Sequence, residues 1–134
     1  MVPFVHRMLP PGQRVGIMTV NASSLGPEHL AGAGIGADVP LAVAGLETEK
    51  EFTRVLLGDE MEFDQEIARE EHVRVARRLV ADHPDIGAIV LECTNMPPYA
   101  ADVQRETGRP VFDIVSLVRL VHDGLASAIG PRPI

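Results

Sequence analysis

The chain has 134 residues, a length that fits one compact domain and leaves no room for two of typical size. Apolar residues make up 46% and charged residues 23%, a globular composition that excludes collagen-like and disordered chains. Twelve Lys and Arg against nineteen Asp and Glu give a net charge of −7, and no basic cluster is interleaved with aromatic residues, so nucleic acid is not expected as a partner.

The sequence shows no targeting segment and contains a single cysteine. No apolar run approaches the roughly 20 residues that a helix needs to span a bilayer, and residues 1–15 lack the basic-then-apolar layout of a signal peptide. The single cysteine, Cys93, cannot form an internal disulfide, which fits a reducing compartment. We therefore expect a cytoplasmic protein that does not bind a membrane.

The first predicted strand covers residues 15–20, which are apolar and β-branched and lead into the polar stretch Asn-Ala-Ser-Ser. A helix is expected from Pro27 to the glycines at 32–36. These glycines have G-x-G-x-G spacing and follow a predicted helix. They therefore do not form the strand-to-helix turn of a dinucleotide site.

A second strand is predicted at 41–44 and a long helix at 64–82, with acids in its early turns and arginines in its late turns. Residues 47–85 hold twelve acidic and six basic side chains, and we expect them to form solvated helix surface. His72 lies on the apolar stripe and is expected to be a rim histidine with its hydrogen bonds satisfied. The other members of that stripe are Ile67, Ala68, Val75, Ala76, Leu79 and Val80.

The run at 86–91 is continuously apolar, as a strand buried on both faces requires, and it predicts a central parallel strand. Pro97 and Pro98 are expected to open a helix that ends near Gly108. A short strand at 110–113 and a last helix at 114–128, with Asp113 as its N-cap, complete the predicted elements.

Strands and helices therefore alternate along one domain spanning residues 1–134. This alternation predicts an α/β fold, with an open, mostly parallel sheet of about four strands and helices on both faces. Ligands of such sheets bind beyond the carboxyl ends of the strands.

Cys93 is the strongest candidate for a catalytic residue, because it directly follows the best-buried strand and precedes the proline-started helix. Free backbone N–H groups there favour the negative charge of a thiolate, which can act as a general base or nucleophile. The Thr94 hydroxyl and Asn95 amide are candidates for holding a substrate carboxylate. The alternative is an inert cysteine that packs as a small hydrophobe, with Asn95 capping the helix.

A second polar group lies at the end of the first predicted strand and contains Thr19, Asn21, Ser23 and Ser24. Because it lies on the same edge of the sheet, it could bind a small polar ligand; helix capping and ordinary loop polarity are the alternative. Glu92 could orient a substrate ammonium group or be a simple strand-end acid. The five histidines show no metal-ligand spacing with Cys, Asp or Glu, so no metal is expected.

The stretch L-E-C-T-N-M-P-P-Y-A at 91–100, with residues 15–25 before it and 110–115 after it, resembles the carboxyl-terminal half of the aspartate/glutamate/hydantoin racemase superfamily. The likeness covers nearly the whole chain, and residues 2–9 resemble the helix that connects the two halves. The resemblance implies two similar α/β domains, each with a cysteine facing the cleft between them, and catalysis without a cofactor. One thiolate removes the α-proton of the substrate, and the other thiol returns a proton to the opposite face.

The resemblance also assigns residues in this chain. It implies that Cys93 is the second-half catalytic cysteine, that Thr94 and Asn95 bind the carboxylate of a small amino-acid-like substrate, and that Thr19, Asn21 and Ser23 form the rim loop. The first half with its own cysteine is absent from these 134 residues. A single thiol reaches only one face of a carbon, so inversion needs a second acid.

Three functions stay open at this point. The chain is half of a racemase or isomerase that needs a first-half domain, a single-cysteine decarboxylase or isomerase of the same superfamily, or a non-catalytic remnant that binds small carboxylates. The expected partner is a missing first-half domain or a further copy in a homo-oligomer.

Overall fold

The computed structural model describes residues 1–58 and 64–128 and contains a parallel sheet with strand order β2-β1-β3-β4. The strands are β1 (Arg14–Thr19), β2 (Leu41–Gly45), β3 (Ile86–Leu91) and β4 (Val111–Phe112). The predicted fold class, an open parallel α/β sheet, is confirmed. The helices are α1 (Val2–Met8), α2 (Pro27–Gly32), α3 (Glu51–Gly58), α4 (Gln65–Asp82), α5 (Ala100–Thr107) and α6 (Ile114–Ala128), with 3-10 turns η1 (Ala22–Ser24) and η2 (Pro97–Tyr99).

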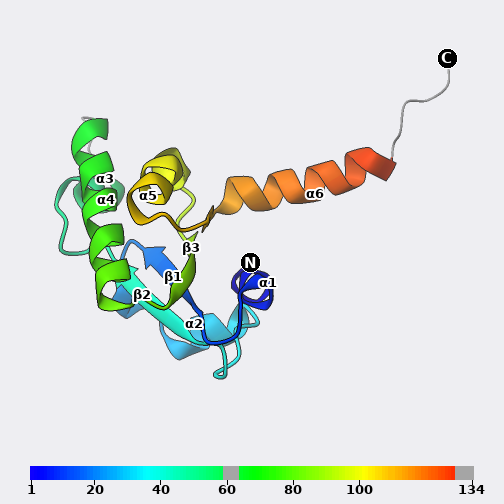
Figure 1. The fold of residues 1–134 in the computed structure, drawn as a ribbon. Coiled ribbons are helices and arrows are strands. Elements are labelled where there is room, and N and C mark those ends of the chain that lie inside the picture. The colour runs from blue at the N-terminus through cyan, green and yellow to red at the C-terminus, as the bar shows by residue number, and fades with distance from the viewer. Residues whose placement is uncertain (59–63, 129–134) are drawn as a thin grey trace, which may run out of the picture.

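Helices cover both faces of the sheet (Figure 1), with α3, α4 and α5 on one side and α1 and α2 on the other. Because alternate side chains of a strand point to opposite faces, each central strand supplies both cores. Met18 and Ile89 pack beneath α4, whereas Ile17 and Val90 pack beneath α1. The α6 helix extends away from this body (Figure 1).

Within residues 47–85 the sequence predicts only one defined helix, at 64–82, whereas the structure also contains α3. Phe52, Val55 and Leu56 recur at helical spacing, but eight residues are too few to give a clear periodic signal. The prolines at 97 and 98 also open the 3-10 turn η2 first, and α5 itself begins at Ala100. The predicted N-cap Asp113 is observed, since its carboxylate accepts the backbone N–H of Ser116. Asp64, the predicted first residue of the long helix, is instead its N-cap and accepts the N–H groups of Glu66 and Ile67.

The buried stripe of α4 differs from the predicted one at its first turn. Ile67 is 45% exposed, so its predicted burial is wrong. The buried stripe starts at Ala68 and repeats every three or four residues, as one face of a helix does. This spacing places Glu71 and His72 in the core. Its buried members are Ala68, Glu71, His72, Val75, Ala76 and Leu79.

Glu71 is 3% exposed and caps α3 from the neighbouring helix. Its carboxylate accepts the backbone N–H of Lys50 at 2.9 Å, of Glu51 at 2.7 Å and of Phe52 at 2.8 Å. These are donors that the first turn of a helix cannot satisfy internally, at the end where the helix dipole favours negative charge. The expectation of solvated surface throughout residues 47–85 is therefore wrong at this position.

His72 is fully buried and sits between two aromatic rings. It stacks on Tyr99 with ring centroids 4.2 Å apart and meets the edge of Phe52 at 4.4 Å. Its Nδ1 lies 2.7 Å from the Ala68 carbonyl, and its Nε2 has no partner among the described residues. The expectation of a satisfied rim histidine is wrong, and burial lowers the pKa of His72 below the ordinary value of 6.5.

Replacing Glu71 by alanine should lower the free energy of unfolding by about 2 kcal/mol or more, because three backbone N–H groups, one buried and two partly buried, lose a charged acceptor. Urea denaturation followed by circular dichroism measures this change. Glu70→Ala, at the exposed neighbouring position of α4, is the matched control and should cost far less. Equal losses for the two variants would contradict the capping role.

The free energy of unfolding should also fall as the pH drops below 6.5, because the unfolded chain then binds a proton at His72 that the folded chain does not. The slope contributed by one such group is up to about 1.4 kcal/mol per pH unit. Urea midpoints between pH 7.5 and 5.5 should decline less for His72→Phe than for the native chain. His122→Gln, on the exposed part of α6, should follow the native curve.

Candidate active site

The Cys93 turn (residues 92–96) leaves the carboxyl end of β3. Cys93 is a half-buried free thiol that packs against the core containing Met96 and Tyr99, and its carbonyl accepts the N–H of Met96 at 3.1 Å. The thiol therefore lies where the core meets solvent. The nearest α-helix starts only at Ala100, so the N–H groups close to Cys93 belong to the turn itself.

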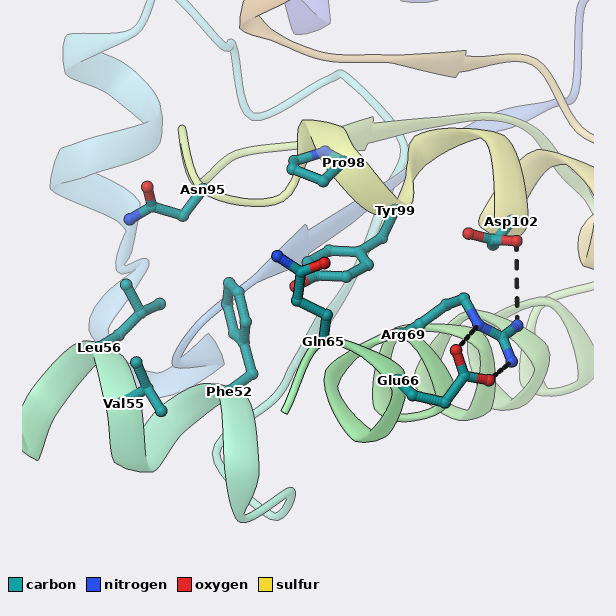
Figure 2. Close-up of a pocket in the computed structure, with 10 residues that line it drawn as sticks. All are labelled: Phe52, Val55, Leu56, Gln65, Glu66, Arg69, Asn95, Pro98, Tyr99 and Asp102. Carbon is teal, nitrogen blue, oxygen red and sulfur yellow. Dashed lines mark hydrogen bonds and ion pairs between the residues drawn. The ribbon is translucent and has the colours of Figure 1, made fainter. Parts of the chain in front are cut away.

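Thr94 and Asn95 are exposed on this turn. Neither their backbone N–H groups nor their side chains take part in a hydrogen bond within the described parts of the chain. Figure 2 shows the Asn95 side chain projecting from the turn on the side of Val55 and Leu56. The turn thus presents several unused hydrogen-bond donors next to the thiol, as a carboxylate site requires.

The ends of β1 and β3 are joined by two hydrogen bonds. The Glu92 N–H donates to the Met18 carbonyl at 2.9 Å, and the Thr19 hydroxyl donates to Glu92 Oε2 at 3.0 Å. Thr19 is 5% exposed, so its hydroxyl acts mainly on Glu92. The structure therefore brings together the segments at the ends of β1 and β3, as expected for parallel strands that end at the same edge of the sheet.

Asn21 and Ser23 bond chiefly to each other. Asn21 Oδ1 accepts the Ser23 N–H at 2.9 Å and the Ser23 hydroxyl at 2.6 Å, which caps η1. Glu47, just beyond β2, accepts the Ala22 N–H at 3.2 Å and so braces the same loop. The capping alternative accounts for these bonds, and substrate binding by Asn21 and Ser23 remains a prediction.

A cleft of roughly 460 Å³ opens beside the Cys93 turn (Figure 2). Arg69 lies on one wall, where it is ion-paired to Glu66 and lies 3.9 Å from Asp102, so it joins α4 to α5. The hydrogen bond from Arg69 holds the pKa of Glu66 below its ordinary value. The lining residues are Phe52, Val55, Leu56, Gln65, Glu66, Arg69, Asn95, Pro98, Tyr99 and Asp102.

Sequence reasoning missed most of this cleft. The apolar spacing of Phe52, Val55 and Leu56 was an available signal for its α3 wall. Nothing in the sequence pairs Arg69 with Asp102, because the two are distant along the chain and meet only through helix packing.

Burial raises the pKa of Tyr99, which favours its protonated, hydrogen-bond-donating form.

Among residues 1–58 and 64–128, no three His, Cys, Asp or Glu side chains come together as a metal site. The expectation that the protein holds neither a metal nor a cofactor remains a prediction. No helix in these ranges has both the length and the apolar character needed to cross a membrane.

Comparisons with known proteins point to one family. The family model for Asp/Glu/hydantoin racemase matches residues 2–118. A dimethylsulfoniopropionate lyase of Durusdinium sp. clade D is 34% identical over 119 residues, covering 86% of this chain and 39% of the lyase. Dimethylsulfoniopropionate lyase 6 of Emiliania huxleyi (strain CCMP1516) is 32% identical over 112 residues, covering 78% of this chain and 29% of that protein.

A solved structure, the allantoin racemase of Pseudomonas fluorescens, shares the fold with a TM-score of 0.58 and 16% sequence identity. The match covers 99% of this chain and 57% of the racemase. The chain thus spans about two fifths of the first lyase and little more than half of the racemase. From the family model and the identity to these relatives, the chain belongs to the Asp/Glu/hydantoin racemase family.

Proposed function

We propose that this chain carries the Cys93 half of an active site that removes the proton from the carbon α to a carboxylate in a small substrate. One observation carries this proposal: the thiol at the carboxyl end of β3 is followed directly by the unused donors of Thr94 and Asn95. Loss of an α-proton pushes negative charge onto the carboxylate. Donors fixed around that carboxylate stabilise the charge as it develops.

Two outcomes can follow removal of the proton to the sulfur of Cys93. A proton returned to the opposite face inverts the carbon, which needs a second acid. Alternatively, the electron pair forms a carbon–carbon double bond and expels a leaving group from the β-carbon, which needs only the first base.

We favour elimination, and therefore a lyase, because the similar proteins above are named dimethylsulfoniopropionate lyases. Dimethylsulfoniopropionate carries a carboxylate at one end and a sulfonium group on the β-carbon. In the proposed step the α-carbon–hydrogen bond breaks, its proton goes to the thiolate, and the carbon–sulfur bond breaks with its electron pair. The products are acrylate and neutral dimethyl sulfide.

Racemisation is the second candidate, supported by the family and by the fold shared with allantoin racemase. It would require an opposing acid from a first-half domain. The other functions left open by the sequence, decarboxylation and carboxylate binding without turnover, have no comparable support.

A partner is proposed for the apolar faces of α1 and α6. Phe4 and Met8 on α1 and Val118, Val121 and Leu125 on α6 are all more than half exposed. Large exposed apolar surfaces favour association. We propose that a first-half domain, or a further copy of the chain, covers these faces.

Cys93→Ala should lower dimethyl sulfide release from dimethylsulfoniopropionate by about 10²–10⁴-fold, the usual contribution of a positioned general base. Gas chromatography measures the product, and nuclear magnetic resonance in D₂O measures deuterium uptake at the α-carbon. Thr48→Ala, at an exposed position in the β2–α3 loop, should leave both rates unchanged. Undiminished exchange in Cys93→Ala would refute the role of the thiol.

The 134-residue chain should self-associate at micromolar concentration when no first-half domain is present. Val121→Glu, which puts a charge on the apolar face of α6, should shift its sedimentation coefficient towards that of the monomer. Arg119→Gln on the same helix should not. A native chain that sediments strictly as a monomer would contradict the proposed contact.

A further inference from the structure

A hollow of roughly 640 Å³ lies on the α1 and α2 side of the site and includes Glu92 in its wall. Most of its lining is apolar, with Leu25 and Leu30 near α2 and Leu117 from α6. The ionisable side chains in the lining are Glu28, His29 and Glu92, with no Lys or Arg among them, and Met1, which bears the amino group of the chain, also lines the hollow. The hollow therefore has mostly apolar walls with the Glu92 carboxylate among them, and Cys93 is the next residue along the chain.

The Glu92 carboxylate is exposed and held in place. Its one described side-chain bond comes from the buried Thr19 hydroxyl, which occupies Oε2 and leaves Oε1 open. No described ion pair involves Glu92, although arginines pair with many other acids of the chain. Those pairs are Arg14–Asp85, Arg54–Glu51, Arg69–Glu66, Arg69–Asp102, Arg74–Glu49, Arg77–Glu106 and Arg105–Asp102.

We infer that Glu92 binds a positively charged, alkylated group of the substrate and so determines which carboxylates this site accepts. The inference rests on the proposed function and specifies its substrate class. A carboxylate beside apolar walls suits a cation whose charge is covered by methyl groups, such as a sulfonium or a quaternary ammonium. A bare ammonium is more strongly hydrated and loses more on entering apolar surroundings, whereas a second anion would be repelled.

The order of residues along the turn supports the same arrangement. Glu92 precedes Cys93, and the donors of Thr94 and Asn95 follow it. A substrate with its cation at Glu92 and its carboxylate at Thr94 and Asn95 would span the thiol. Two carbons separate the charged groups of such a substrate, and the α-carbon, which is bonded to the carboxylate carbon, is the one from which the proposed step removes the proton.

The test uses two ligands of the same shape that cannot be cleaved at a sulfonium. They are 3-(trimethylammonio)propionate, which is cationic at one end, and 4,4-dimethylpentanoate, its neutral isostere. Isothermal titration at low ionic strength should show that the native chain prefers the cationic ligand by at least about fivefold. Adding 0.5 M salt should shrink this preference, because salt screens the charge pair.

Glu92→Gln keeps an acceptor for Thr19 and removes the charge, so it should bind the two ligands equally while its affinity for the neutral one is unchanged. Glu28→Gln removes the other carboxylate of the same hollow and should retain the preference. The inference would be overturned if the native chain bound neither ligand or bound both equally. It would also be overturned if the preference survived in Glu92→Gln, or if 3-aminopropionate bound more tightly than 3-(trimethylammonio)propionate. Charge preference without proton abstraction would instead refute only the proposed function.

Discussion

The parallel pairing of β1 with β3 is the interaction on which the site depends. Its register places Met18 opposite Leu91, so both strands end at the same edge of the sheet. The Glu92 N–H then extends the ladder to the Met18 carbonyl, and the Thr19 hydroxyl reaches Glu92. At Gly16 of β1 a Cβ would lie 3.2 Å from the Ile86 side chain and 3.3 Å from that of Leu79, tight contacts that these side chains would have to shift to relieve.

The α4 helix provides the second support. Glu71 satisfies the first turn of α3, and His72, one residue on, packs beneath Tyr99 of η2. Glu71 fixes α3 because a buried carboxylate is costly unless it is paired, whereas His72 contacts η2 by ring stacking. Together they set the positions of α3 and of the segment after the Cys93 turn. The cleft beside Asn95 is the space that remains between these elements.

The chemistry proposed for the turn follows from its charge pattern. Along the chain, Cys93 follows a carboxylate that no described cation neutralises and precedes two residues with unused donors. Such a pattern suits a zwitterionic substrate that bridges the thiol. It also reconciles a family named for racemases with relatives named as lyases, because both reactions can begin with removal of an α-proton and differ in what happens to the electron pair.

The sequence by itself determined the alternation of strands and helices, the central position of the strand at 86–91, the cap Asp113, and the family. These features depend on local apolar patterns, capping chemistry and a specific motif, all of which are readable along the chain. The tertiary structure alone decided the burial of Glu71 and His72, the Arg69–Asp102 pairing and the bond from Thr19 to Glu92. In each case the partner is supplied by a different element, so the environment of the side chain exists only after the helices have packed on the sheet and the parallel strands have aligned their ends.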